Sequence, residues 1–348
     1  MAASRFSPPA TPLLVGERHL PDDVLQRVLV GLPLDDHRAA ASVCKSFRGI
    51  ITGPRFLAAR RRYGFAERGI VSVKSTHGDL TICMAHSGET ARITGNFHLN
   101  PGSTTDGGSR LFVSTIDLAA NHQRYGIWAV DASSRRWRRF VTVPHGQSGY
   151  SLEWHAGLLY VAGGTRDSDP PTTLNSLRAF NEATGLWDDL PPMLHACEGA
   201  ASGVIGNELF IAGGYHDPDD SGNPATLQIY DIPSRRWRLG AALPEPRMWT
   251  IGVVADGKLF LISTAVDSSR DLLVYDPQSN SWTEAAPPPT VTNTRVVKSA
   301  CAHKGRLVVF LSNGRAFERA NDGSWYPCEV AAGGLTYANF QAAPVILG

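Results

Sequence analysis

The chain has 348 residues, a formal net charge of +1 and hydrophobic residues at 43% of its positions. This length accommodates two domains, and a nearly neutral chain lacks the basic footprint of a nucleic-acid-binding protein. No apolar run approaches the length of a membrane span, and the N-terminus has no signal-peptide core. The sequence therefore predicts a protein of the cytoplasm, the nucleus or both, with neither nucleic acid nor membrane as a partner.

The cysteines are few and scattered. They are odd in number and lack the spacing of zinc ligands, which predicts reduced thiols, no bound metal and no cofactor. They stand at Cys44, Cys83, Cys197, Cys301 and Cys328.

The first 68 residues carry a helical pattern behind a short tail. Residues 1–15 are predicted to be disordered, and residues 16–62 to form a small helical domain with a linker at 63–68. Apolar residues at positions 20, 24, 25, 28, 29 and 32 recur at helical spacing. Asp22 and Asp23 suit a helix start, and Gly31 suits its end.

Further helical segments follow in this domain. Residues 34–48 form a second helix-forming stretch, and Pro54 precedes a third that runs through residue 62. The basic cluster at residues 60–62 is predicted to be a solvated face or the rim of a partner contact.

A tryptophan recurs through the rest of the chain. Each copy follows an apolar strand-like stretch and a short polar run that suits a turn between antiparallel strands. In the last copy we match Phe317 and Glu318 to the residues that precede this turn. The copies are spaced by 50, 50, 45 and 43 residues and end at Trp137, Trp187, Trp237, Trp282 and Trp325.

Each repeat also has an upstream strand, twice ending in paired glycines. These are Gly163 with Gly164 and Gly213 with Gly214, and residues 259–264 form an eroded copy. Paired glycines suit positive φ angles or the close approach of a neighbouring backbone. Four short strands in a period near 47 predict a β-propeller, and residues 69–348 then give about six blades, with five or seven as alternatives. The first blade would be degenerate, near residue 91, because no tryptophan stands there.

These features resemble two known families. The glycine pair, the aromatic residue beside the turn and the tryptophan resemble the kelch repeat, which implies that the terminal stretch at 335–347 pairs into the first blade. Leu20-Pro21, Leu32-Pro33 and Val43-Cys44-Lys45-Ser46-Phe47-Arg48 resemble an F-box, with Phe47 where that family usually has tryptophan. In this order they resemble the F-box/kelch-repeat family common in plants. The implied fold is an all-β kelch propeller of six blades behind a small all-α F-box domain.

The resemblance implies that the helical domain binds a partner. A segment of about 45 residues is close to the lower limit for independent folding, and its apolar positions outnumber what three short helices bury in one another. Packing of the helices on the propeller is the alternative. The implied partner is the Skp-type adaptor of a cullin ligase, which residues of the F-box pattern would bind: Leu20, Pro21, Val24, Leu25, Val28, Leu29, Leu32, Pro33, Val43, Cys44 and Phe47.

Aligning the repeats locates a candidate surface for a protein target. Gln147, Cys197, Arg247 and Arg295 fall at equivalent positions before the innermost strands, a region that lines one mouth of the ring in kelch receptors. An ion pair within the ring is the alternative for Arg247 and Arg295, and burial between blades is the alternative for Trp249. The predicted target-binding residues are Gln147, Tyr150, Glu198, Arg247, Trp249, Arg295 and Lys298.

The resemblance implies a non-catalytic function. The chain would be the substrate-recognition subunit of an SCF-type ubiquitin ligase, holding a protein target for ubiquitination and degradation. A scaffold or cytoskeletal binding module is an alternative from another class. A kelch-fold enzyme is a remote one: a copper oxidase would need His195, Cys197 and Tyr150 to converge, and an enzyme has no need of an F-box.

Overall fold

The computed structural model divides into two compact units, residues 1–68 with 346–348 and residues 69–345. It describes residues 14–15, 18–19, 21–32, 36–51, 55–63, 67–76, 79–84, 90–93, 97–117, 124–131, 136–144, 146–166, 168, 170–215, 225–263, 272–289, 297–313, 315–328 and 340–347.

The helical unit contains four short helices. They are α1 (Asp22–Val30), α2 (Asp36–Val43), α3 (Lys45–Ile51) and α4 (Phe56–Arg62). The first begins after Pro21, whose carbonyl oxygen accepts the backbone N–H groups of Val24 and Leu25, each at 3.0 Å. The second predicted helix is interrupted at Cys44, whose Sγ atom accepts the N–H of Phe47 at 3.5 Å.

One strand pair precedes these helices. The strands β1 (Leu14–Val15) and β2 (Arg18–His19) pair antiparallel. The prediction of a disordered tail over residues 1–15 is therefore wrong at its last two residues, because Leu14 and Val15 pair with residues that follow the tail.

The core of the helical unit is formed by Leu29, Val30 and Phe56, with Phe47 partly buried against it. Arg60 is only 1% exposed, so the prediction of a solvated basic cluster is wrong at this position. Its Nη1 atom donates to the carbonyl oxygens of Val30 and Leu32 at 2.9 and 2.6 Å, and it lies 2.9 Å from Nε2 of His37. Arg60 thus joins α4 to the end of α1, whose last carbonyl groups have no partner within the helix.

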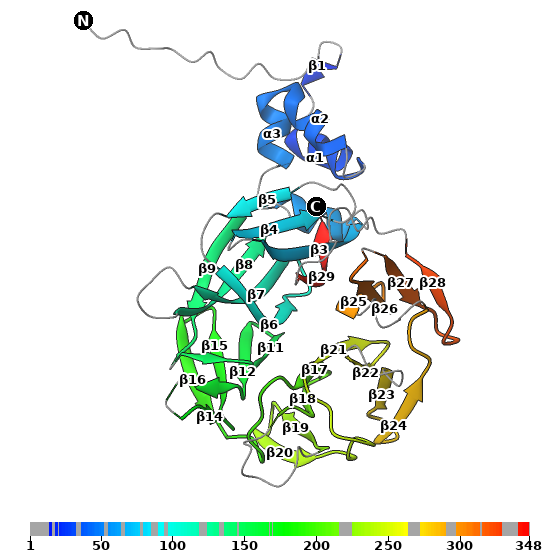
Figure 1. Cartoon of the computed structure of the whole chain (residues 1–348). Coiled ribbons are helices and arrows are strands. Elements are labelled where there is room, and N and C mark those ends of the chain that lie inside the picture. Colours follow the sequence, from blue (N-terminus) through cyan, green and yellow to red (C-terminus); the bar gives the residue numbers. More distant parts are fainter. Residues whose placement is uncertain are drawn as a thin grey trace, which may run out of the picture. The chain divides into compact units, whose positions relative to one another are not determined.

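The second unit is a ring of six four-stranded antiparallel sheets (Figure 1), which confirms the predicted propeller and its blade number. Blade 1 contains β29 (Phe340–Leu347), β3 (Glu67–Thr76), β4 (Asp79–Met84) and β5 (Thr90–Ile93). Blade 2 contains β6 (Phe97–Thr105), β7 (Arg110–Asp117), β8 (Arg124–Asp131) and β9 (Arg136–Thr142). Blade 3 contains β11 (Ser151–His155), β12 (Leu158–Ala162), β15 (Leu177–Asn181) and β16 (Leu186–Leu190).

The remaining blades have the same order of strands. Blade 4 contains β17 (Ala201–Ile205), β18 (Glu208–Ala212), β19 (Leu227–Asp231) and β20 (Arg236–Leu239). Blade 5 contains β21 (Thr250–Ala255), β22 (Lys258–Ser263), β23 (Leu272–Asp276) and β24 (Ser281–Ala285). Blade 6 contains β25 (Val297–His303), β26 (Arg306–Leu311), β27 (Ala316–Arg319) and β28 (Trp325–Pro327).

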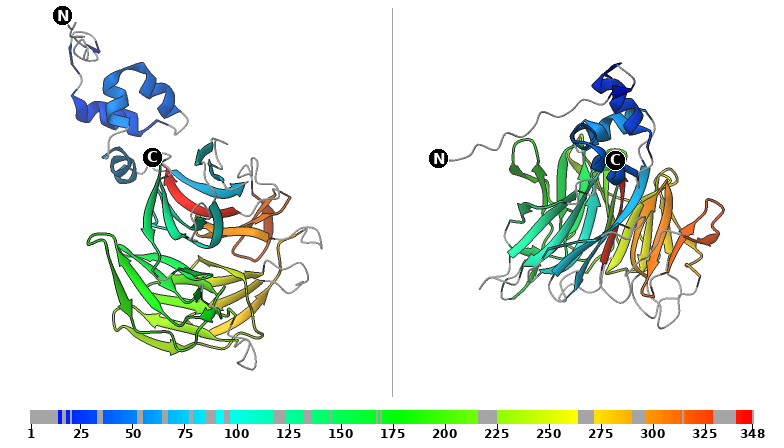
Figure 2. Two further views of the ribbon diagram at one scale, coloured as in Figure 1. Left: turned by 60° about the vertical axis from the view of Figure 1, so that its left-hand side comes forward. Right: turned by 90° about the horizontal axis from the view of Figure 1, so that it is seen from above.

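The last strand of the chain closes the ring. Strand β29 lies beside β3, so blade 1 combines the end of the chain with its earliest propeller strands (Figure 2). This confirms the predicted pairing of the terminal stretch. The arrangement leaves no open sheet edge between the first and last blades. The first strands of blades 2 to 6 contact one another in succession and are therefore the innermost.

The glycine pairs allow the backbones of neighbouring blades to approach closely. Gly163 and Gly164 have φ angles of +66° and +93°, and the N–H of Gly164 donates to the carbonyl oxygen of Cys197 in the next blade at 2.7 Å. Gly214 repeats this bond to Arg247 at 2.7 Å. Side chains at these positions would be strained, which is why glycines follow the second strands of blades 3 and 4.

The repeated tryptophans join neighbouring blades. The indole Nε1 groups of Trp237, Trp282 and Trp325 donate to carbonyl oxygens of Pro191, Ala241 and Ala286, each in the preceding blade, at 2.8 to 3.0 Å. Opposite each tryptophan stands one residue of the third strand. This residue is Phe180, Tyr230 and Tyr275 in blades 3 to 5 and Arg319 in blade 6.

The predicted match of Phe317 and Glu318 to the last repeat is therefore wrong. Arg319 pairs with Trp325 as Tyr275 pairs with Trp282, and the intervening segment of blade 6 is one residue shorter. An arginine consequently occupies the position that is aromatic in the three preceding blades.

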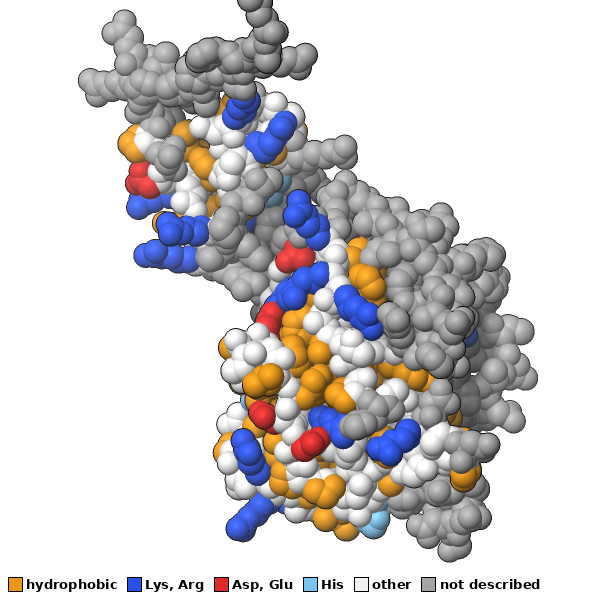
Figure 3. All heavy atoms as spheres, turned by 90° about the vertical axis from the view of Figure 1, so that its left-hand side faces the viewer, with side chains coloured by type: hydrophobic (Ala, Val, Ile, Leu, Met, Phe, Trp, Pro, Cys, Tyr) orange, Lys and Arg blue, Asp and Glu red, His pale blue; other side chains and the backbone are white. Residues whose placement is uncertain are grey.

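Ion pairs also connect blades 2 and 3. Arg110 on β7 makes two bonds of 2.6 and 3.0 Å to the carboxylate of Glu182, which follows β15, and Arg138 on β9 lies 3.1 Å from the same carboxylate. The opposite side of the Arg110 guanidinium is bonded to Asp106 at 2.8 Å. Figure 3 shows this side of the molecule, where Lys and Arg side chains alternate with Asp and Glu among hydrophobic side chains.

Candidate protein-interaction site at the mouth of the ring

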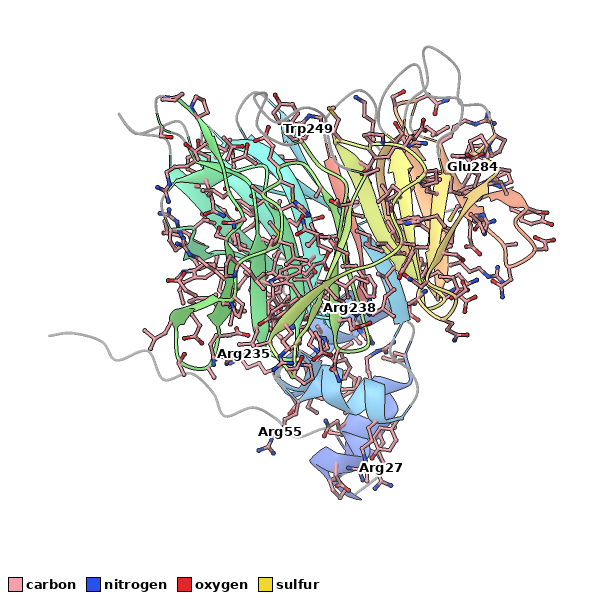
Figure 4. All side chains as sticks on the ribbon, turned by 90° about the horizontal axis from the view of Figure 1, so that it is seen from below. Arg27, Arg55, Arg235, Arg238, Trp249 and Glu284 are labelled. Carbon is pink, nitrogen blue, oxygen red and sulfur yellow. The ribbon has the colours of Figure 1, made fainter. Side chains whose placement is uncertain are left out.

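One end of the ring gathers the segments between successive blades. Because each blade is antiparallel, the segments that enter the first strands lie at the same end as those that follow the second strands. We call this end the mouth. Figure 4 shows Trp249 at the mouth and Arg235, from a turn between the third and fourth strands, at the opposite edge of the ring.

A ladder of backbone hydrogen bonds runs along the mouth. The N–H of Gly199 donates to the carbonyl oxygen of Gly149 at 2.7 Å, and the N–H of Trp249 donates to that of Gly199 at 2.9 Å. These three residues occupy equivalent positions and have φ angles of +65°, +61° and +53°. Trp249 thus adopts a left-handed conformation that the two preceding blades assign to glycine. For a bulky side chain this conformation is an outlier and costs about 1 to 3 kcal/mol.

The side chain of Trp249 is 43% exposed, so burial between blades, the alternative given for it, is wrong. Its neighbour Met248 is equally exposed, and Leu194 is exposed in the corresponding segment before blade 4. Sequence analysis missed Met248 and Leu194. Repeat alignment could have found Met248, because it occupies the position of Glu198 in the preceding blade.

Polar groups lie beside these apolar side chains. The strands β10 (Gln147–Ser148), β13 (Thr165–Arg166) and β14 (Thr172–Thr173) form a small sheet at the mouth. Glu198 forms a backbone bridge with Tyr215 and accepts a hydrogen bond from the Thr165 hydroxyl group. Burial raises the pKa of Glu198.

Two predicted target-binding residues are interior, which contradicts their assignment to an exposed surface. Gln147 is 1% exposed, and its Nε2 atom donates to the carbonyl oxygen of Gly163 at 3.0 Å. Tyr150 is buried, and its hydroxyl group lies 2.6 Å from that of Ser114. Both side chains were misassigned because a repeat position fixes the place in the blade but not the direction of the side chain.

The other predicted residues differ in their environments. Arg247 makes an ion pair with Glu245 at 2.6 Å, as the alternative for this residue anticipated. Lys298 is partly buried on β25, at an irregularity between Val297 and Ser299. Arg295 lies outside the described residues. The structure thus brings Glu198, Arg247 and Trp249 to the mouth.

The predicted adaptor-binding residues divide into exposed and interior positions. Pro21 is exposed, and Val28 and Val43 are 59% and 65% exposed. Leu25 and Leu29 are buried, so the expectation that they present an apolar face to a partner is contradicted in this conformation. Val24, Leu32, Cys44 and Phe47 are partly buried, and Leu20 and Pro33 lie outside the described residues.

The chemistry of His195 and Cys197 reflects their packing. The backbone of His195 is held by Gln228, which bonds its N–H at 2.8 Å and its carbonyl oxygen at 3.1 Å. Burial raises the pKa of Cys197 to about 12, so its sulfur is a thiol at neutral pH. Within the described residues, no three His, Cys, Asp or Glu side chains converge as metal ligands would. None of the described helices is long and apolar enough to span a membrane.

A carboxylate links three of the innermost strands. Glu153 on β11 accepts the hydroxyl group of Ser202 on β17 at 2.7 Å and that of Thr104 on β6 at 3.5 Å. Burial raises the pKa of Glu153 to about 7, against the smaller opposing effect of the two hydrogen bonds. The protonated form of Glu153 is therefore favoured relative to that of an exposed carboxyl group.

Each of the two units matches the model of a known domain family. Residues 118–311 match the KLHDC2/KLHL20/DRC7 Kelch-repeats domain, and residues 18–58 match the F-box domain. An F-box/kelch-repeat protein of Arabidopsis thaliana is 23% identical over 308 residues, which are 84% of this chain and 76% of the relative.

Kelch-like proteins match part of this chain. Kelch-like protein 34 of Homo sapiens is 26% identical over 46% of this chain, and Kelch-like protein 21 of Danio rerio is 25% identical over 53%. The matches span 27% and 35% of those longer proteins. The six-bladed ring, its glycine pairs and the F-box match at residues 18–58 together show that this chain belongs to the F-box/kelch-repeat family.

Proposed function

We propose that this chain is the substrate-recognition subunit of an SCF-type ubiquitin ligase. Its helical unit binds a Skp-type adaptor, and the mouth of its propeller binds a protein target for ubiquitination and proteasomal degradation. The protein acts in the cytoplasm, the nucleus or both, without a catalytic group of its own. It raises the effective concentration of the target at the ubiquitin-carrying enzyme.

The observation that carries the target-binding part is Trp249. Its left-handed backbone is costly, and neighbouring blades avoid that cost with glycine. Strained residues that the surrounding structure maintains are concentrated at functional sites. Tryptophan and arginine are also enriched among the residues that contribute most to protein binding. An exposed indole beside Met248 and the Arg247–Glu245 pair is therefore well suited to anchor a protein segment.

The adaptor contact is tested at Val28 and Val43. Because both are exposed, Val28→Asp and Val43→Asp should leave the helical core intact while placing a charge in the proposed contact. Co-purification with a Skp-type adaptor should fall by at least tenfold in the double variant. Leu239→Asp, at an exposed position on β20, is the matched control and should retain the adaptor. Full adaptor binding by the double variant would overturn this contact.

The target contact is tested by capture under proteasome inhibition. Proteins that bind the wild-type chain, but not Trp249→Ala, are the expected targets. Their abundance in cells should rise when the Val28→Asp and Val43→Asp variant replaces the wild type. A scaffold or cytoskeletal function predicts captured partners whose abundance does not depend on the adaptor contact. That result would overturn the degradative function.

A further inference from the structure

A cavity of about 610 Å³ lies between blades 5 and 6. Phe260, Val274 and Leu307 supply its apolar lining. It extends to the turns between β21 and β22, between β25 and β26, and between β27 and β28, at the end of the ring opposite the mouth. Its charged lining residues are Asp256, Lys258, Glu284, Arg306, Arg319 and Asp322. Figure 4 shows Glu284, on β24, toward the same edge of the ring as Trp249.

The cavity coincides with the change from an aromatic residue to Arg319. In blade 5 the ring of Tyr275 lies 5.8 Å from that of Phe210 in the preceding blade. In blade 6 the guanidinium of Arg319 takes the same place, 5.8 Å from the ring of Phe260. A guanidinium on a flexible stem fills this gap differently from a rigid aromatic ring.

The charges of the cavity are not balanced pairwise. Lys258 bonds to Asp276 at 2.9 Å, and Arg306 bonds to Glu318 at 2.7 Å. Across the part of the chain that the structure describes, Arg319 has no carboxylate partner, and its buried Nε atom has no hydrogen-bond acceptor. Arg319 is only partly exposed, so water reaches its charge incompletely and an anion beside it would be favourable. Among the lining residues, Asp256, Glu284 and Asp322 are exposed and form no ion pair with any described residue.

We propose that this cavity binds a small organic zwitterion of the amino-acid type. Its carboxylate bonds to the guanidinium of Arg319, and its ammonium group faces the exposed acidic residues that line the cavity. The planar guanidinium matches the geometry of a carboxylate, and the ring of Phe260 supports it from one side. The volume is within the range of small-molecule sites.

Three probes of similar length separate the two charges. They are 5-aminopentanoate, with both groups, pentanoate, with the carboxylate alone, and pentylamine, with the ammonium alone. Saturation-transfer NMR on the full chain measures their binding. The zwitterion should bind with a dissociation constant on the order of millimolar, as expected for so small a ligand. Removal of either charge should weaken binding at least tenfold. Equal binding of the three probes, or no binding of the zwitterion, would overturn the proposal.

Two substitutions locate the site. Arg319→Tyr restores the residue type of blades 4 and 5 and should keep the ring folded while abolishing zwitterion binding. Arg319→Gln should also abolish it, which covers a failure of the tyrosine variant to fold. Arg238→Gln, at an exposed arginine of blade 4 paired with Glu208, is the matched control and should bind as the wild type does. Undiminished binding by both folded Arg319 variants would contradict the assignment.

Zwitterion binding at Arg319 is independent of the proposed ligase function. Arg319→Tyr should retain both the adaptor and the targets captured through Trp249, because Arg319 ends β27 at the end of the ring opposite the mouth. Loss of zwitterion binding alone therefore tests the cavity, whereas loss of adaptor or target capture in the earlier variants tests the ligase function.

Discussion

The indole ring of Trp249 covers Gly199. The N–H of Trp249 donates to the carbonyl oxygen of Gly199 at 2.9 Å, and a Cβ atom at Gly199 would lie 2.7 Å from the indole. Glycine at 199 is therefore required by its neighbour as well as by its own φ angle of +61°. The position of the Trp249 indole therefore depends on glycine at position 199.

We expect Gly199→Ala to displace the indole of Trp249. The substitution should lower the free energy of unfolding by more than the roughly 1 to 2 kcal/mol that a left-handed alanine costs. It should also reduce target capture, because the anchor is moved. Chemical denaturation measures the first effect and affinity capture the second.

Gly206→Ala is the matched control for this substitution. Gly206 has the same φ angle of +61°, but a Cβ atom there meets no atom within 4 Å. The control should therefore show the backbone cost alone and retain target capture. Equal stability losses in the two variants, with capture preserved in both, would refute the role of the Gly199 contact.

The pKa of Glu153 makes the stability of the ring depend on pH. Burial raises this pKa from 4.5 to about 7, so the folded chain keeps a proton that the unfolded chain releases. Stability should consequently fall as the pH rises from 4.5 through 7 and then level. Glu153→Gln removes the carboxylate and can still bond the hydroxyl groups of Ser202 and Thr104.

The Glu153→Gln variant should exceed the wild type in unfolding free energy at pH 8, on the order of 1 to 3 kcal/mol. The difference should shrink toward pH 5. Urea unfolding at the two pH values measures it, and Glu284→Gln, at an exposed position, should change stability little. A variant that is less stable than the wild type at pH 8 would show that the ionised carboxylate is favourable.

Local patterns predicted the architecture well. The tryptophan spacing indicated the blades because Trp237, Trp282 and Trp325 make the same bond to the preceding blade. The last copy was misaligned because an aromatic and an acidic residue, Phe317 and Glu318, imitate the repeat two positions early. Only the strand register shows that Arg319 faces Trp325.

Side-chain burial was predicted less well, because it depends on tertiary neighbours. Arg60 belongs to a run of three arginines that looks solvated, yet it turns inward to the carbonyl groups of another helix. Tyr150 is close in sequence to residues of the mouth. Its hydroxyl group nevertheless forms a hydrogen bond with that of Ser114 in the preceding blade. Neither partner is close in sequence, so no local pattern signals the contact.

Arg60 provides a test of what holds the helical unit together. Arg60→Met should leave the carbonyl groups of Val30 and Leu32 without their charged donor, at a cost of about 1.5 to 3 kcal/mol. Thermal unfolding followed by the helical circular-dichroism signal should show this loss of stability. Adaptor binding should also become weaker. Arg62→Met is the control, since Arg62 is exposed and, among the residues that the structure describes, lies over the ring of Tyr63. Similar losses of stability in both variants would mean that the buried contacts of Arg60 stabilise the helical unit no more than the exposed Arg62 does.

The Arg110–Glu182 pair is expected to stabilise the junction of blades 2 and 3. Its two bonds join strands of different blades, and Arg110 holds the pKa of Glu182 below its usual value. A carboxylate with a lowered folded-state pKa contributes stability above its unfolded pKa and loses it as the pH falls through the folded value. Glu182→Gln should therefore be less stable than the wild type at pH 7 and converge with it in acid.

A double-mutant cycle with Arg110→Met isolates the pair. The coupling should be about 0.5 to 3 kcal/mol at pH 7, as is usual for residues in direct contact. The Arg238–Glu208 pair lies within blade 4 and is more exposed, so the same cycle there should give a smaller coupling. Because only the first pair crosses between blades, its removal should also increase hydrogen exchange on both sides of the junction. A larger coupling for Arg238–Glu208 would show that crossing between blades adds nothing to the strength of the pair.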